Sequence, residues 1–515
     1  MEKNVTKNAS LKLIGCICAF VLITGCVAVA GSKKAESPED FFKLYPGVYT
    51  EREKSLVEKY IADNKALEER GEIDVQALIN GTLPKETPGI GPVIKVTEDM
   101  VRYNNLKYDP ENPVLHDAAY AKKLGYKDIL AYPSFGGHDD TFMVPYPPPA
   151  RDKLLVSDLN HNFTNYRPVY PGDTLYLVMN SRQVTDLTPT EGSIYRGITI
   201  QSKGSIYNQK GEKVTDVIFR VTESIRVYKE GKGPKNPGFF DMWDAPDWMS
   251  RSAHYYTDKD WDLIRKIWSE EKRQGAAPLY WEDVKVGDEP AWTLDGPIEA
   301  SVSPVPPWGM GLGGSRTMKK EIMDPDMFKT MVRGKEDGIY RLPNKEDYIP
   351  PAPVANPMGK GPGGPPPMDK GPEGDAAIDT TDIHKKRDDR APLINYMGRD
   401  FAIRHINNWM GDHGWLHNIR WSIMDPRCHA LYGKDVPVNP QAERFLSKVP
   451  KMKDKYVNAH GLTNDVAIVK SYVYDKYVRD GNFMVELAWW IESIDGDIWE
   501  EGGATIKLPS KRLAK

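Results

Sequence analysis

FMVELAWWIESI (Phe483–Ile494), Asp495-Gly496-Asp497 and IWEEGGATIKL (Ile498–Leu508) follow one another near the end of the chain. The two outer pieces are rich in the β-branched and aromatic residues that strands favour. The middle piece has the Asp-Gly composition of a tight turn. Together they predict an antiparallel hairpin with two long arms.

An earlier stretch of the chain has the same pattern. The residues from Val93 to Tyr228 favour strands. Within them, Asn208-Gln209-Lys210-Gly211 predicts a turn before the alternating stretch Val214–Val227. A second strand-rich unit opens at Tyr280–Asp288 and includes a helical segment at Phe401–Trp409. The chain therefore consists of two similar halves, each with an irregular start, one helix and a run of antiparallel strands.

Four further segments complete the predicted organisation. Charged, helix-prone sequence indicates an N-terminal helical extension, and prolines and glycines are frequent from Pro350 to Pro372, a composition typical of an extended loop. The expected boundaries are 1–30 for an export segment, 31–88 for the helical extension, 89–230 for the first half, 231–278 for a linker and 279–510 for the second half, with the insertion at about 345–392.

Charge and cysteine content exclude some classes of protein. The 515 residues have a formal net charge of −4 with acids and bases interspersed, which gives no field that would attract nucleic acid. Of the four cysteines only Cys428 lies in the folded body, so no disulfide framework can form there.

The N-terminus has the order of features of an export signal. Three lysines precede the apolar run Leu13–Thr24, which is too short to span a bilayer comfortably. Ile23-Thr24-Gly25-Cys26 resembles the lipobox of bacterial lipoproteins, in which the cysteine is lipidated. We therefore expect a cell-envelope protein held on the membrane by a lipid on Cys26. Ala28-Val29-Ala30 leaves plain secretion open, and a cytoplasmic location follows if the segment is no signal.

The segment Gly411-Asp412-His413-Gly414-Trp415-Leu416-His417 carries the candidate chemistry. Asp412 and His417 are five positions apart, and on a helix or at its mouth they would lie on neighbouring faces that reach one substrate carbon. An acid with an imidazole is suited to proton transfer near neutral pH.

Three segments resemble those of a known family. Tyr166–Leu175, which contains Tyr170-Pro171-Gly172-Asp173, and Asn208–Val214 are similar to segments of the MaoC-like acyl dehydratase and (R)-specific enoyl-CoA hydratase family, and so is Glu282–Asp288. The resemblance covers roughly residues 90–230 and 279–510. It implies an α+β double hotdog, in which two curved antiparallel sheets each wrap a long central helix, and it allows a homo-oligomer.

The resemblance also implies a catalytic pair. The family motif runs Gly-Asp-x-Asn-Pro-x-His, and Gly411, Asp412 and His417 match its spacing, with Gly414 and Trp415 in place of Asn and Pro. In the first half, Asp109 and His116 are seven apart around Asn112-Pro113, so we expect that half to be non-catalytic. His417 would act as the base that activates water, and Asp412 would orient the water and assist protonation.

The rest of the expected site follows from the same resemblance. Gly461 in Ala459-His460-Gly461 matches the family's glycine at the start of the central helix, which would donate its N–H to the thioester oxygen as an oxyanion hole. Trp415 and His460 would contact the substrate. The expected reaction is reversible hydration of a 2-enoyl thioester, such as an enoyl-CoA, to a 3-hydroxyacyl compound, and it needs no cofactor.

Two other kinds of site, a metal site and a dinucleotide site, have weaker support in the sequence. His413 and His417 have the spacing of two metal ligands on a helix, but Gly414 stands where the zinc-protease motif has Glu, so we expect no metal. Gly309–Gly314 fits a dinucleotide pattern by letter, yet prolines precede it where a strand is required.

The predicted location and the predicted substrate conflict. Acyl thioesters are cytoplasmic, whereas an export signal carries the protein out of the cytoplasm. Two hypotheses of different class therefore stay open. The chain is either a hydro-lyase of the hydratase/dehydratase type or a catalytically silent envelope lipoprotein that binds an acyl or other hydrophobic ligand in its groove.

Overall fold

The computed structural model describes ten stretches of the chain. These are 51–136, 154–187, 195–226, 254–298, 317–335, 337–341, 396–424, 443–459, 461–462 and 464–513. The N-terminal export segment with Cys26, the Gly309–Gly314 stretch and the predicted insertion at about 345–392 lie outside the described residues.

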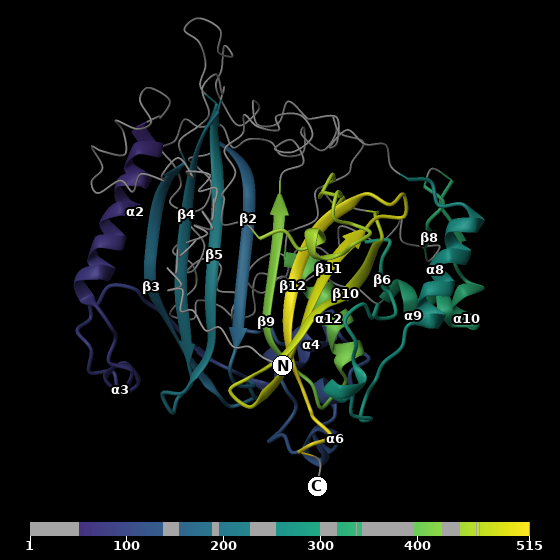
Figure 1. The fold of residues 1–515 in the computed structure, drawn as a ribbon, viewed down its shortest axis with the longest axis horizontal. Helices are drawn as coiled ribbons and strands as arrows, with labels where there is room; N and C mark the ends of the chain where they lie inside the picture. The colour runs from purple at the N-terminus through teal and green to yellow at the C-terminus, as the bar shows by residue number, and fades with distance from the viewer. Residues whose placement is uncertain are drawn as a thin grey trace, which may run out of the picture.

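Ten strands form one antiparallel sheet whose order repeats in mirror fashion. The order is β1-β3-β4-β5-β2-β9-β12-β11-β10-β6, so five strands of the first half stand beside five of the second in the same relative positions. The strands are β1 (Ile90–Lys95), β2 (Leu154–Asn165), β3 (Thr174–Leu187), β4 (Tyr195–Tyr207), β5 (Lys213–Arg226), β6 (Thr293–Asp295), β9 (Trp415–Met424), β10 (Ala467–Arg479), β11 (Asn482–Glu492) and β12 (Ile498–Leu508). Figure 1 shows the two sets side by side.

The helices are mostly short and lie around this sheet. They are α2 (Glu51–Arg70), α3 (Val75–Ile79), α4 (Glu98–Tyr108), α5 (Pro113–His116), α6 (Ala118–Lys123), α8 (Asp258–Glu270), α9 (Thr317–Met323), α10 (Pro325–Phe328) and α12 (Tyr396–Met410), with 3₁₀ turns η2 (Trp281–Asp283) and η4 (Leu446–Lys448) and the small hairpin β7 (Val332–Arg333) and β8 (Tyr340–Arg341). Figure 1 places α2 at the outer edge, where it contacts β3, and α8 at the other end near β6.

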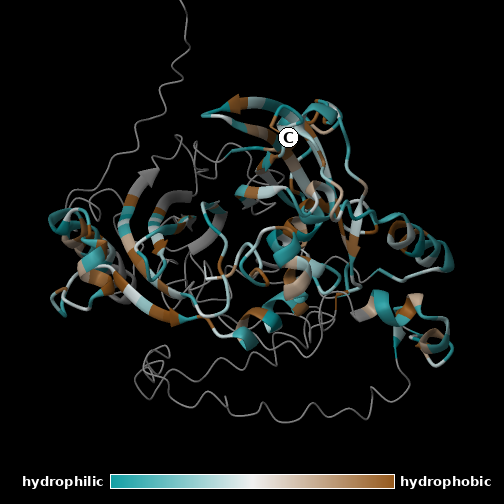
Figure 2. Ribbon diagram, turned by 90° about the horizontal axis from the view of Figure 1, so that it is seen from below, coloured by the Kyte–Doolittle hydropathy of each residue, from teal (hydrophilic) through white to brown (hydrophobic). Residues whose placement is uncertain are grey.

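Strands β2 and β9 join the halves into one sheet. They pair antiparallel, with His161 opposite Trp421 and Phe163 opposite Ile419. Phe163, Ile419 and Trp421 belong to a single hydrophobic core that draws residues from both halves. Seen from below in Figure 2, the sheet curves in each half. Because the core crosses the β2–β9 joint, the halves do not have separate cores.

Helix α12 is wrapped by the sheet of the second half. It contacts β9, β10, β11 and β12, and from Gly398 to Met410 every residue except Trp409 is buried. A helix buried on all sides is the central helix of a hotdog, so the predicted double hotdog fold is confirmed. The helix had been expected to follow Gly461, but it lies before Asp412 in the chain.

The buried charges of α12 are all matched by partners. The Arg404 guanidinium pairs with Asp295 of β6, and the Arg399 guanidinium pairs with the neighbouring Asp400 carboxylate at 3.0 Å. Burial lowers the pKa of His405 to about 3, so its neutral ring forms hydrogen bonds with the hydroxyls of Ser471 and Thr293. An unpaired charge here would cost several kcal/mol, on the order of the stability of a whole domain.

The first half supplies part of this pairing. Ser134 donates to the Asp400 carboxylate at 2.9 Å, and the Tyr132 hydroxyl donates to the Asp400 backbone oxygen at 2.6 Å. Residues more than 260 positions apart in sequence are thus bonded in the interior. The central helix of the second half therefore depends on the first half for its polar partners.

The two predicted hairpins agree with the observed strands. The earlier turn falls between β4 and β5, and the stretch Phe483–Leu508 forms β11 and β12, with the first arm ending two residues before the predicted end. In the part of the chain that the structure describes, no helix has the length and apolar character needed to cross a membrane.

Close packing of β12 on β11 gives a test of the core. A Cβ at Gly502 would overlap the Trp489 indole and the backbone oxygen of Arg420. We expect Gly502→Ala to lower the free energy of unfolding by about 1–3 kcal/mol, because neither neighbour can move freely. Chemical denaturation measures this. The exposed Lys453→Ala should stay within about 0.5 kcal/mol of wild type, and equal stability of Gly502→Ala would contradict the observed packing.

Candidate ligand-binding site

A pocket lies where the C-terminal end of α12 and the start of β9 meet the first half. Its first-half wall comes from the segment around α5, from residues 130–135 and from the end of β2. Most of the wall is apolar, with Val114, Leu115, Leu130, Phe135, Val169 and Leu416 among the lining residues. An apolar concave site with few polar groups is the usual form of a small-molecule site.

Several polar groups interrupt the apolar wall. Asn165 and Asn407 are buried and line the pocket together with Trp415 and Asp412. The Trp415 indole N–H donates to the Asn165 backbone oxygen at 3.0 Å, while the Asn165 side chain bonds to Leu416 and Thr215. These bonds fix the start of β9 against the end of β2, and so fix one wall of the pocket.

The Asp412 carboxylate is held by donors on both oxygens. The Tyr120 hydroxyl donates to Oδ2 at 2.6 Å, and an Arg273 nitrogen lies 3.4 Å from Oδ1. Burial and the bond to Asp412 raise the pKa of Tyr120 to about 12, so this hydroxyl keeps its proton. Tyr126 also donates to the Asp412 backbone oxygen at 3.2 Å. Asp412 is thus fixed by the first half and by the linker.

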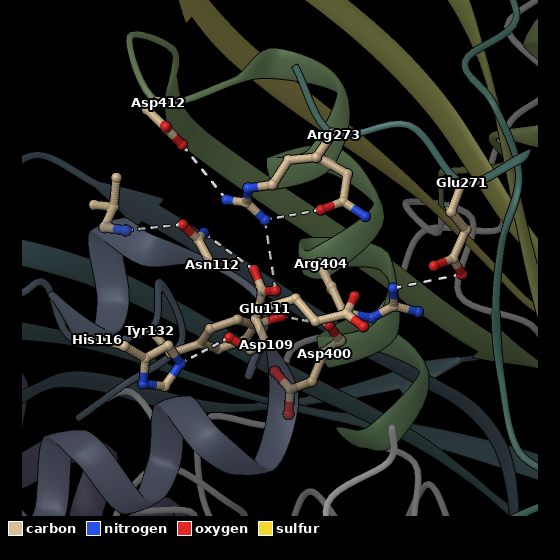
Figure 3. A network of polar contacts seen from close by, with 12 residues as sticks. Asp109, Glu111, Asn112, His116, Tyr132, Glu271, Arg273, Asp400, Arg404 and Asp412 are labelled. Atoms are coloured by element: carbon tan, nitrogen blue, oxygen red, sulfur yellow. Dashed lines mark hydrogen bonds and ion pairs between the residues drawn. The ribbon is translucent and has the colours of Figure 1, made fainter. Parts of the chain in front are cut away.

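Arg273 stands between the acids of the two motif-like segments. Its guanidinium lies 3.7 Å from Asp109 and 3.4 Å from Asp412, and it donates to Asn408 at 3.0 Å (Figure 3). Two buried carboxylates close together need such a cation, since a like-charged pair in the interior is costly. Asn112 adds a hydrogen bond to the Asp109 carboxylate at 3.1 Å.

The linker also binds the end of α12 through its backbone. Gln274 N–H donates to the Asn408 oxygen and Asp412 N–H donates to the Gly275 oxygen. Carbonyls in the last turn of a helix have no partner within the helix, and the linker supplies one. Gly411 has a φ of 69°, which L side chains rarely adopt, and this turn separates α12 from β9.

Of the expected pair Asp412 and His417, only Asp412 lines the described pocket. Because α12 ends at Met410, the helical spacing expected for the pair does not apply. His417 is the extra residue of a bulge in β9, since Leu416 pairs with Ile506 and Asn418 with Thr505. Its Nδ1 bonds with the Asn165 backbone oxygen at 3.1 Å, and it does not line the described pocket.

The surroundings of His417 keep it neutral. Burial lowers the pKa of His417, and the nearby Lys507 lowers it further. Its ring packs edge-on against Tyr166. A neutral imidazole is chemically able to accept a proton, but His417 does not line the described pocket, whereas Asp412 does.

The predicted oxyanion helix at Gly461 is wrong. Gly461 is in no helix, and the next long element after it is the strand β10. Gly461 packs so closely on the Trp499 ring that a Cβ would overlap it, so the absence of a side chain serves packing. His460 lies outside the described residues.

The first-half motif is closer to the pocket than expected. Asn112 lines the pocket and Asp109 lies behind it, but the His116 Nε2 bonds to the backbone oxygen of Asp109 at 2.9 Å rather than to its carboxylate. Neither half therefore places a histidine against its motif acid in the residues that the structure describes.

The two histidines with the spacing of metal ligands are not in a helix. His413 follows the end of α12 and contacts the Ala276 oxygen, and His417 is in β9, so they do not share a helix face. Among the described residues, no group of three or more His, Cys, Asp or Glu side chains is placed to hold a metal ion.

Sequence patterns missed Tyr120, Arg273, Asn165 and Asn407. Asn407 and Asn408 were the available signal, since two adjacent amides near the end of a predicted helical segment need hydrogen-bond partners or a function. Tyr120 and Arg273 carry no such local signal, because each reaches Asp412 from a distant part of the chain.

No family model and no curated protein matches the chain. Solved structures similar to it include a MaoC domain protein dehydratase from Chloroflexus aurantiacus, with 11% identity over 82% of this chain and 94% of that one and a TM-score of 0.41. A conserved hypothetical protein from Mycobacterium tuberculosis with a double hotdog fold is 10% identical over 81% of this chain and 94% of that one, with a TM-score of 0.36. An R-hydratase from Pseudomonas aeruginosa is 19% identical over 28% of this chain and 87% of that one, with a TM-score of 0.19. The chain is similar in fold to MaoC-like dehydratases and double-hotdog proteins.

Proposed function

We propose that this protein binds an acyl-type or other largely apolar ligand in the pocket between its halves. The observation that carries the proposal is the pocket itself, in which mostly apolar side chains and a few buried polar groups converge from both halves. Burying an acyl chain there would yield about 25 cal/mol for each Å² of apolar surface removed from water.

The state of the acid and histidine residues favours binding over catalysis. Asp412 already accepts from Tyr120 and lies beside Arg273, and His417 lies outside the pocket. General acid–base chemistry needs its groups within hydrogen-bond reach of the same reacting atoms. A ligand in the pocket would meet the acid and not His417.

Filling the pocket should abolish ligand binding. Ala131 lines the pocket, and Ala131→Leu adds three carbons to the space that a ligand would occupy. We expect the uncharged dye Nile red to fluoresce on binding to wild type and to bind Ala131→Leu at least tenfold more weakly. Titration of the dye measures this.

A matched control uses the same change outside the pocket. Ala119 is exposed on α6, and Ala119→Leu should bind the dye as wild type does. Equal binding of the dye by Ala131→Leu would show that the pocket is not the binding site, and absence of binding to wild type would contradict the proposed function.

A second candidate function is reversible hydration of a 2-enoyl thioester. The specific observation in its favour is that the Asp412 carboxylate lines the pocket. In this reaction the carboxylate would accept a proton from water while the water oxygen attacks the β-carbon. It would then return a proton to the α-carbon. Water is thereby added across the double bond without a cofactor.

Two variants distinguish this reaction from binding alone. Asp412→Asn should reduce hydration of crotonyl-CoA and longer enoyl thioesters by about 10²- to 10⁴-fold, the usual contribution of a general base. His417→Ala should retain most activity, because His417 does not line the pocket. Loss of enoyl absorbance measures the rate. No wild-type activity on any enoyl thioester, or loss only in His417→Ala, would contradict this mechanism.

We also propose that the mature protein is attached to the envelope membrane by a lipid on Cys26. The support is the order of basic residues, apolar run and Ile23-Thr24-Gly25-Cys26 in the sequence. An acyl-binding pocket on a membrane-attached protein would lie near a source of acyl compounds.

Lipid attachment can be tested separately from binding. Cells expressing the full chain should incorporate radiolabelled palmitate into the protein, and Cys26→Ala should abolish the label. Cys18→Ala, which removes another cysteine of the same segment, should keep it. A soluble, unlabelled wild-type protein would contradict the attachment.

A further inference from the structure

Asn407 is a buried amide in the last turn of α12 that lines the pocket. Its exposed fraction is 5%, and its side chain has no hydrogen-bond partner among the described residues. The adjacent Asn408 accepts from Arg273, and Asn165 across the pocket bonds to Leu416 and Thr215. Of these three asparagines, Asn407 is the one whose side chain has no hydrogen-bond partner among the described residues.

A buried amide without a partner in the protein is unfavourable, and such groups are rare in folded chains. When the amide faces a pocket, a polar atom of a ligand is the natural partner. The amide offers two N–H donors and one acceptor oxygen, so it can bind a carbonyl oxygen. The apolar wall around it can receive the chain attached to that carbonyl.

The charges around Asn407 limit the kind of carbonyl. The Asp412 carboxylate is part of the same wall, and the nearest guanidinium behind it, Arg273, already lies beside Asp412 and Asp109. Arg167 also lines the pocket, but its side chain is 52% exposed and pairs with Glu212. A free carboxylate ligand would face Asp412 with no buried cation to offset the repulsion.

We propose that Asn407 donates a hydrogen bond to the neutral carbonyl of an ester, thioester or amide with an apolar chain, and that the pocket disfavours the free fatty acid. This inference rests on the proposed binding function and specifies its ligand class. Asn407 is the specificity-determining residue, and Asp412 is the group that disfavours anions.

Displacement of bound Nile red from the full chain tests the inference at neutral pH, where octanoate is ionised. Octanamide should displace the dye from wild type at a concentration at least tenfold lower than octanoate. In Asn407→Leu the dye should still bind, and about tenfold more octanamide should be needed to displace it. The ratio of the displacing concentrations of octanoate and octanamide should fall accordingly. Equal displacement by both compounds in wild type, or an unchanged preference in Asn407→Leu, overturns the inference.

Thermal unfolding separates this role from a structural one. Asn407→Leu should melt at the same or a higher temperature than wild type, because it removes a buried amide that has no partner. Asn64→Leu is a matched control on α2, where the amide accepts from the Arg182 N–H and lies away from the pocket. It should lower the melting temperature and leave the ligand preference unchanged.

The two possible failures are distinct. If Nile red does not bind to wild type, the proposed binding function fails. If the dye binds and Asn407→Leu lowers the melting temperature without changing the preference for octanamide, Asn407 is structural and only the present inference fails.

Discussion

The burial of α12 is the constraint on which the rest of the structure depends. A helix that carries Arg399, Asp400, Arg404 and His405 into the interior is stable only if its charges are paired and the His405 ring has hydrogen-bond partners. Those partners come from β6, from β10 and from the first half. The same requirement therefore fixes the sheet of the second half around the helix and holds the two halves together (Figure 1).

The pocket is a consequence of how α12 ends. The linker bonds to Asn408 and Asp412, and Gly411 reverses the chain into β9, so the last turn of the helix faces the first half. Arg273 neutralises the two acids that meet there (Figure 3). The acid of the hydratase-like motif lines this pocket, while the histidine of the same motif is in the bulge of β9 and does not line it.

Local patterns were sufficient to predict the strands and their duplication. The hairpin β11–β12 and the turn between β4 and β5 follow from alternation and turn residues, which act within a few positions. The position of the central helix was wrong, because Ala459-His460-Gly461 was given a role by resemblance. Close contact with Trp499 explains that glycine, and such a contact depends on a strand that is 38 residues further along the chain.

The sequence by itself determined two similar strand-rich halves, a helical segment near residues 401–409, and the candidate acid Asp412. Only the tertiary structure decided which groups meet that acid. Tyr120 and Arg273 approach Asp412 from segments 292 and 139 positions away, and Asn407 is left to face the pocket. Hydrophobic periodicity encodes which residues are buried, whereas the pairing of polar side chains depends on the relative placement of elements that no local pattern records.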